Sequence, residues 1–371
     1  MVVGVAGVIV AATCTRAPAP APAPAPAGPP PSGRPALLQG TLPTMTEEVT
    51  LRAGERTVPG TLVAPSVRGP WPAVVLLAGS GPTDRDWNSP LLPARNGSGK
   101  LLADELARHG VVVLRFDKAA AGTNPGPSLD QLTIDTYRDE AAAAIALVRG
   151  RADVRADRVF VAGHSEGGIH ATRVAAVAPG IAGVIYLSSA SRTMADILLT
   201  QLEGNLRNPL AGLTDAQVAA ELASLRAALD AFLTGQPVDP KAASTIPKLQ
   251  QLVAGLTRPA TAVLTRALLG FDNAAEAAKL AAPLLVVSGG KDVQVDPELD
   301  GRRLAEALRG ARRDVTFHIA PDADHVLKHE PKSLAALRAD LLAAQTGYNA
   351  EGRVLDADAV GAIVAWLVAR G

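Results

Sequence analysis

Short apolar segments alternate with longer amphipathic ones from about residue 45 to the end of the chain. Two early segments, 47–54 and 56–65, predict an opening hairpin. Six short runs rich in β-branched residues then predict buried strands, mainly parallel. These runs are 72–79, 111–117, 158–163, 182–189, 283–289 and 314–320.

Between these runs lie segments with the composition and spacing of helices. Regular alternation of strands and helices predicts a doubly wound α/β sheet, whose ligands bind at the carboxyl ends of the strands. The predicted helices are 99–110, 133–150, 166–178, 298–310 and 356–370.

One interval interrupts this alternation. Residues 191–281 contain several Leu/Ala-rich helical runs and no convincing strand. A segment of this length is too long for a loop, so it predicts a helical cap over the carboxyl edge of the sheet. The α/β core then consists of residues 41–190 and 282–371. The alternative is that these helices only cover apolar surface or form a dimer contact.

The first 40 residues differ in composition from the rest. Residues 1–14, MVVGVAGVIVAATC, have the length of a signal-peptide core, and the terminal cysteine resembles a lipidation site. The Pro/Ala-rich residues 15–40 predict an extended spacer or a disordered tail. We expect an exported periplasmic or cell-surface protein, tethered through lipidated Cys14. Because no basic residues precede the apolar run, a cytoplasmic location stays open.

Overall composition narrows the class of partner. The 371 residues include 36 Lys and Arg against 36 Asp and Glu, so net charge gives no attraction to nucleic acid. Cys14 is the only cysteine, which excludes an internal disulfide. With 48% hydrophobic residues the chain can bury a large core, and small neutral molecules are the expected partners.

A serine between two glycines stands where a predicted strand meets a predicted helix. The segment VFVAGHSEGGIHATRVAAVA places Ser165 in a Gly-x-Ser-x-Gly motif. Such a turn needs small neighbours and lifts the serine oxygen above the sheet, near the positive end of the helix. The context predicts a nucleophile, and the alternative is a structural serine at a helix start.

Two segments, AGSGPTDRDWN (78–88) and GHSEGG (163–168), resemble the serine esterases of the α/β-hydrolase superfamily. The resemblance covers the chain from about Thr41 to its end. It implies a mostly parallel eight-stranded sheet with helices on both faces and a helical cap, and the chain order nucleophile, acid, histidine. The family's usual histidine before the first of these glycines is Ala78 here, which leaves the packing of this loop open.

A tetrahedral intermediate needs two backbone N–H groups directed at its oxyanion. We expect one from Glu166, which follows the nucleophile, and one from Ser80, with Gly81 as the alternative. The segment TDRD (83–86) is expected to brace this loop by local hydrogen bonds, or to form a solvated surface turn.

The general base and its acid are expected in the loops after the last two strands. His325 follows the final strand, where a triad histidine must lie to reach the serine, and His329 is its competitor. Asp292 follows a strand and a glycine turn, where a carboxylate can orient the imidazole, and Asp296 is the alternative.

Other chemistries fit the sequence less well. The segment ARNGSGKLL lacks two residues of a phosphate loop, and no His/Cys cluster indicates a metal, so we expect no cofactor. The leading hypothesis is a serine carboxylic-ester hydrolase acting on small or short-chain acyl esters beneath an apolar cap. A serine peptidase or amidase with the same triad, and a catalytically silent binding protein, remain open.

Overall fold

The computed structural model describes residues 42–208 and 211–371. The described residues contain an eight-stranded sheet in the order β1-β2-β4-β3-β5-β6-β7-β8. β1 and β2 form an antiparallel hairpin, β2 pairs antiparallel with β4, and every later pair is parallel. The sheet confirms the mostly parallel α/β fold that the sequence predicts. Its strands are β1 (Thr44–Ala53), β2 (Arg56–Pro65), β3 (Trp71–Leu77), β4 (Val112–Phe116), β5 (Val154–His164), β6 (Gly183–Leu187), β7 (Leu284–Gly289) and β8 (Val315–Ala320).

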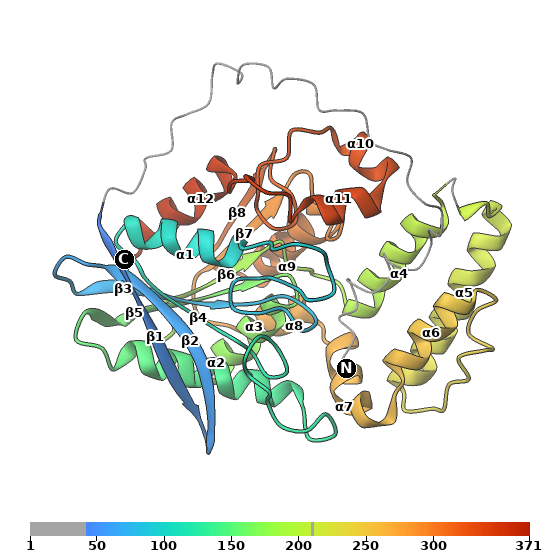
Figure 1. Ribbon diagram of the computed structural model, residues 1–371, viewed down its shortest axis with the longest axis horizontal. Helices are drawn as coiled ribbons and strands as arrows, with labels where there is room; N and C mark the ends of the chain where they lie inside the picture. Colours follow the sequence, from blue (N-terminus) through green and yellow to red (C-terminus); the bar gives the residue numbers. More distant parts are fainter. Residues whose placement is uncertain (1–41, 209–210) are drawn as a thin grey trace.

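Helices cover both faces of the sheet (Figure 1). Their buried side chains form one apolar cluster on each face. On one face lie α2 (Ile134–Arg149), α3 (Gly167–Val177) and α9 (Arg303–Gly310). On the other lie α1 (Ser98–Arg108) and α12 (Ala357–Val368).

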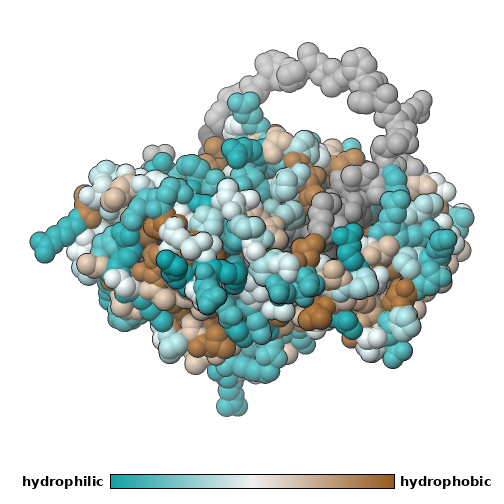
Figure 2. Space-filling model, turned by 60° about the horizontal axis from the view of Figure 1, so that its bottom comes forward, coloured by the Kyte–Doolittle hydropathy of each residue, from teal (hydrophilic) through white to brown (hydrophobic). Residues whose placement is uncertain are grey.

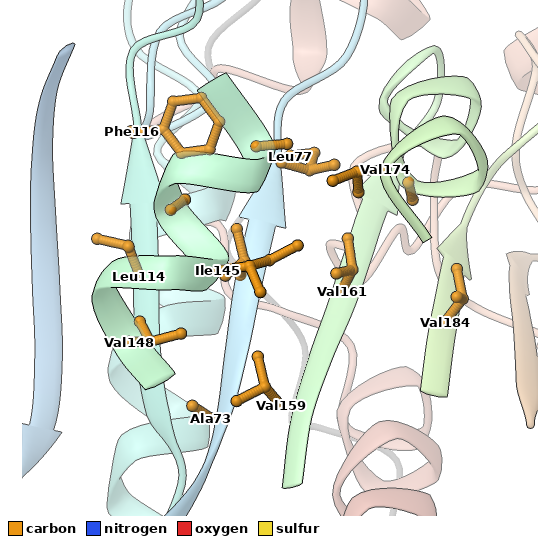
Figure 3. Close-up of a cluster of buried hydrophobic side chains, with 14 of the residues drawn as sticks. Ala73, Leu77, Leu114, Phe116, Ile145, Val148, Val159, Val161, Val174 and Val184 are labelled. Atoms are coloured by element: carbon orange, nitrogen blue, oxygen red, sulfur yellow. The ribbon is translucent and has the colours of Figure 1, made fainter. Parts of the chain in front are cut away.

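Packing beneath α2 shows how the core holds the strands in register (Figure 3). Ile145 and Val148 of α2 share a buried cluster with Leu114 of β4 and with Val159 and Val161 of β5. Full burial of such a side chain contributes about 1.5–3 kcal/mol. The core therefore fixes the relative positions of the strands whose carboxyl ends carry the polar residues described below.

Helices α4 (Met194–Leu206), α5 (Asp215–Leu233), α6 (Pro247–Leu256) and α7 (Ala262–Leu269) form a separate group beside the sheet, here named the α4–α7 layer (Figure 1). This layer has its own apolar core, which also contacts α2 and α3 through Tyr137 and Ile169. Its helices fall within residues 191–281, the range expected to form a cap.

The expected cap range of 191–281 extends beyond this layer. α8 (Asn273–Ala277) packs against α3 and α9, and Ala277 and Leu280 belong to the core under the sheet. The amphipathic pattern of residues 273–281 indicates a buried face but does not identify the element that buries it. The α4–α7 layer therefore ends with α7, because the residues after it pack against the core of the sheet.

Two further short helices, α10 (Leu334–Ala339) and α11 (Leu341–Gly347), lie between β8 and α12 and have no counterpart in the sequence prediction. The leader (1–14), the Pro/Ala segment (15–40) and Cys14 lie outside the described residues. Within the described ranges, no helix combines the length and apolarity needed to cross a bilayer. On the face shown in Figure 2, hydrophobic residues are interspersed with hydrophilic ones.

Candidate active site

Ser165 occupies a tight turn between β5 and α3, with φ of 53°. Its N–H donates to the carbonyl of Leu187 over 2.9 Å, which ties the turn to β6. A Cβ atom at Gly163 would lie 2.2 Å from the Gly167 carbonyl oxygen, and one at Gly167 would lie 2.5 Å from that of Leu77. Glycine is therefore required on both sides of the serine, as the motif predicts.

Asp292 and His325 come together in the loops after β7 and β8. Asp292 Oδ2 lies 2.8 Å from His325 Nδ1, and both side chains are buried. Asp292 Oδ1 accepts the N–H groups of Gln294 and Val295, at 2.7 and 2.9 Å. A carboxylate partner at Nδ1 selects the tautomer that donates there, leaving Nε2 with a lone pair.

The alternative acid and base have other partners. Asp296 Oδ1 accepts the N–H groups of Glu298 and Leu299, so Asp296 caps the π-helical turn η4 (Pro297–Arg302). His329 Nδ1 lies 3.3 Å from Asp356 Oδ2. The structure thus pairs Asp292 with His325.

Ser165 and His325 line one cavity of about 80 Å³. The loop 79–96 forms much of its wall, and Gln294, Gln345 and Tyr348 complete it. Among the described side chains, no direct hydrogen bond joins Ser165 to His325. In substrate-free enzymes the contact between nucleophile and base is often long, and it shortens when the substrate binds.

The α4–α7 layer contributes no residue to the described lining of this cavity. Leu198 and Leu252 of this layer are buried in its own apolar core. The expectation that the cap roofs the serine is therefore wrong for this cavity. Its apolar lining includes Leu91 and Leu92 in the loop before α1, together with Trp87 and Val326.

The two expected oxyanion donors flank the serine. Ser80 lines the cavity with Ser165, and a Cβ atom at Gly79 would lie 3.3 Å from Ser165 Cβ. Within residues 42–208 and 211–371, the backbone N–H groups of Ser80 and Glu166 donate to no protein acceptor. Both N–H groups are therefore without a protein acceptor in these ranges, and their role as oxyanion donors stays a prediction.

A buried charged cluster lies behind these donors. Lys118 Nζ donates to the carbonyl of Gly79 and lies 3.5 Å from Glu166 Oε1. His170 Nε2 lies 3.5 Å from the same carboxylate oxygen. Although burial opposes ionisation, Lys118 and His170 together lower the pKa of Glu166 to about 2. Sequence reasoning missed this cluster, although two charged residues after a buried strand, in RFDK, were a visible signal.

The charged segment 83–86 braces the loop through long-range contacts. Arg85 Nη2 lies 3.0 Å from Asp117 Oδ2, and its Nη1 lies 2.9 Å from Glu48 Oε2. Asp86 pairs with the buried Arg115 at 2.7 Å. The segment is thus fastened to β1 and β4, and the solvated-turn alternative is wrong.

His164, the residue before the serine, connects the turn to the histidine loop. Its Nε2 lies 2.9 Å from the carbonyl oxygen of His325, and its ring stacks on Trp87 with centroids 4.4 Å apart. Burial, with the neighbouring His325, lowers the pKa of His164 to about 3. The ring is therefore neutral at pH 7, with its proton on Nε2.

No group of three or more His, Cys, Asp or Glu side chains in the described ranges is arranged to hold a metal ion. The cavity instead combines a serine, an imidazole–carboxylate pair and free backbone donors. This donor set is suited to acyl transfer.

Comparisons with known proteins agree with this chemistry. The family model described as serine aminopeptidase, S33, matches residues 97–332, which include Ser165, Asp292 and His325. Esterase EstD of Thermotoga maritima is 27% identical over 273 residues, covering 73% of this chain and 58% of the relative. The chain therefore spans less than two thirds of the length of this curated relative.

Two solved structures are similar in overall architecture. One is brefeldin A esterase, described as a bacterial homologue of human hormone-sensitive lipase, with 18% identity and a TM-score of 0.49, over 92% of this chain and 80% of that one. The other is the proline iminopeptidase of Mycobacterium smegmatis, with 20% identity and a TM-score of 0.47, over 82% and 99%.

Proposed function

Because the chain belongs to the serine aminopeptidase S33 family of α/β-hydrolases, we propose that it hydrolyses small carboxylic esters through an acyl-enzyme on Ser165. The observation that carries this proposal is the contact of 2.8 Å between Asp292 and His325, with His325 and Ser165 on the wall of one cavity. An oriented imidazole beside a serine at a strained turn is the arrangement that activates a hydroxyl for nucleophilic attack.

In the first half-reaction, His325 Nε2 takes the hydroxyl proton of Ser165 as the serine oxygen bonds to the ester carbonyl carbon. The backbone N–H groups of Ser80 and Glu166 donate to the resulting oxyanion. When the tetrahedral intermediate collapses, its bond to the alcohol oxygen breaks and the imidazolium protonates that oxygen. Asp292 holds the imidazole in the required tautomer and stabilises its charged form.

In the second half-reaction a water molecule replaces the alcohol. His325 removes a proton from the water as its oxygen attacks the acyl carbon, and the same oxyanion donors stabilise the second intermediate. Collapse releases the carboxylic acid and returns the proton to Ser165. Ser165, His325 and Ser80 line the cavity, and Asp292 acts through its contact with His325.

The cavity favours a neutral ester over an aminopeptidase substrate. No Asp, Glu, Lys or Arg side chain occurs among its described lining residues. A free α-amino group would enter as a cation and lose water without a carboxylate partner, which is costly. The match to the aminopeptidase family model therefore identifies the family but not the substrate. The lining of the cavity supports an ester as the substrate.

The volume of the cavity supports a short acyl chain. A cavity needs about 10–15 Å³ to hold one water molecule, so about 80 Å³ accommodates a chain of a few heavy atoms. Leu91 and Leu92 provide apolar contact for such a chain.

Labelling with a fluorophosphonate tests the proposal, because this probe reacts only with an activated serine. We expect labelling of the wild type and none of Ser165→Ala, and faster turnover of acyl esters than of aminoacyl amides. A wild-type protein that is folded but unlabelled would support a silent binding protein. Faster amide turnover would support a peptidase.

We also propose export and a tether through Cys14, on the composition of residues 1–40. Mass spectrometry of the protein from its native host tests this. Cleavage before Cys14 with an added lipid mass is expected, whereas an unmodified chain that retains Met1 in the cytosol contradicts it.

A further inference from the structure

Lys118 is a buried cation two residues beyond the end of β4. Its ammonium donates to the carbonyl of Gly79, in the loop that carries Ser80. Lys118 lines a small residual space of about 10 Å³ together with Ala78, Tyr137 and His170. A fully buried lysine needs hydrogen-bond partners to offset its desolvation. Here the partners are the carbonyl oxygen of Gly79 and the carboxylate of Glu166.

The contact with Gly79 has a geometric consequence for Ser80. The carbonyl of Gly79 and the N–H of Ser80 belong to one planar peptide unit, and in a trans peptide they point in opposite directions. Because Lys118 holds the carbonyl, the N–H is directed away from Lys118. On that side lies the cavity that Ser80 and Ser165 both line.

The same ammonium also reaches the residue that supplies the second donor. Lys118 Nζ lies 3.5 Å from Glu166 Oε1, while the backbone N–H of Glu166 is the other oxyanion donor. One side chain therefore contacts the segments on both sides of the oxyanion position. An ammonium has three donor hydrogens, so it can bind a carbonyl and a carboxylate together, and its charge complements that of the carboxylate.

Charged and polar side chains surround Lys118. Four side chains face Lys118: Glu166 just before α3, His170 in α3, and Tyr137 and Glu140 in α2. The centroid of the Tyr137 ring lies 5.6 Å from Lys118 Nζ. Burial lowers the pKa of Lys118, and Glu166 and Glu140 oppose this effect. Positive charge behind the Gly79 carbonyl polarises the peptide, which makes the Ser80 N–H a stronger donor.

We propose that Lys118 is the positioning residue of the oxyanion site, aligning the Ser80 and Glu166 N–H groups through the Gly79 carbonyl and the Glu166 carboxylate. The inference rests on the proposed ester hydrolysis. Lys118 does not touch the substrate. Its effect is therefore confined to the transition state, in which negative charge develops on the carbonyl oxygen of the ester.

The test replaces Lys118 by methionine, which has a similar length and no charge. Since Lys118→Met alone leaves Glu166 as a buried unpaired charge, the main variant is Lys118→Met with Glu166→Gln, which retains both backbone donors. Loss of one oxyanion donor costs about 10²–10³ in kcat, and we expect a fall of about 10² with KM nearly unchanged. Tyr137→Phe, which keeps the ring over Lys118, is the control and should retain wild-type turnover.

A second readout uses an alkyl boronic acid, which forms a tetrahedral adduct with an active serine. Its affinity should fall by about the same factor as kcat, because both report the oxyanion site. Wild-type kcat and boronate affinity in the folded double variant would overturn the inference while leaving ester hydrolysis intact. A wild-type protein that neither hydrolyses esters nor reacts with fluorophosphonate would overturn the proposed function, and this inference with it.

Discussion

The ring of His164 donates a hydrogen bond to the backbone carbonyl of His325 over 2.9 Å. The residue before the proposed nucleophile thus fixes the backbone of the proposed base. Because His164 ends β5 and His325 lies in the loop after β8, this single contact spans the carboxyl edge of the sheet between them.

The buried His164 should make stability depend on pH. Its pKa is lowered to about 3 in the folded state, against about 6.5 in the unfolded chain. The unfolded state therefore binds the proton first, and the stability present above pH 6.5 is lost as pH falls toward 3. Between pH 7 and pH 5 the loss amounts to about 2 kcal/mol.

Denaturant unfolding at the two pH values, compared between wild type and His164→Phe, measures this dependence. The variant should lose less stability between pH 7 and pH 5, whatever its absolute stability. Equal losses in both proteins would show that His164 is not the titrating group.

Removal of the nucleophile should separate activity from stability. Ser165→Ala and Ser165→Gly should both lose about 10⁴–10⁶ in turnover. At φ of 53° alanine is strained and glycine is not, so the glycine variant should be more stable than the alanine variant by about 1 kcal/mol. Kinetics on a short-chain ester and thermal melting measure the two effects. Residual wild-type turnover in either purified variant would reject the assignment.

The acid and base should act as a unit. Asp292→Asn and His325→Ala should each lower kcat by about 10⁴, and the double variant should be little worse than either. The matched control is Asp296→Ala, which removes a helix cap worth about 1 kcal/mol of stability and should leave kcat unchanged. A larger kcat loss for Asp296→Ala than for Asp292→Asn would identify a different acid.

Substrate length should be set by the loop before α1. Leu92→Ala enlarges the cavity wall and should shift preference from acetate toward longer esters by about tenfold, since one methylene in such a pocket is worth about 1–3 kcal/mol. Leu198→Val in the α4–α7 layer is the control and should leave the profile unchanged. Relative kcat/KM on acetate, butyrate and octanoate esters measures the shift. An unchanged profile for Leu92→Ala, or a shifted one for Leu198→Val, would contradict this role of the loop before α1.

Breaking the brace of the oxyanion loop should affect folding as well as catalysis. Arg85→Met leaves the buried Asp117 without its cationic partner, and such a loss costs about 3–5 kcal/mol. Arg207→Met, which breaks exposed ion pairs, should cost less than about 1 kcal/mol. Urea unfolding of both variants provides the measurement. Equal destabilisation would contradict a bracing role for Arg85.

The fold and the Asp292–His325 contact were predictable because both follow from local pattern. Apolar runs identify strands, and a strand end with a glycine turn identifies where a loop must carry its polar side chain. The paired glycines at the end of β7 illustrate this, because a Cβ atom at Gly289 would lie 2.5 Å from the Asp324 carbonyl oxygen. Close approach of the acid and base loops is thus encoded locally.

The wall of the cavity was not predictable in the same way. Amphipathic residues 191–281 show that a helix face is buried, but not which surface covers it. The short helices α10 and α11 adjoin at Asp340, which interrupts the helical pattern between them. Lys118 was visible as a charge after a strand, but its partner Gly79 depends on the path of the loop 78–88. Long-range contacts of this kind have no sequence periodicity.

The order of strands also bears on how the protein loses activity on heating. β5, which precedes Ser165, lies between β3 and β6, whereas β8, which precedes His325, lies at the edge of the sheet. Edge elements open at a lower free energy than central ones. We therefore expect thermal inactivation to begin with detachment of the base while the nucleophile is still in place. The half-life of the enzyme at high temperature is then governed by β8 and by the α12 helix that packs on it.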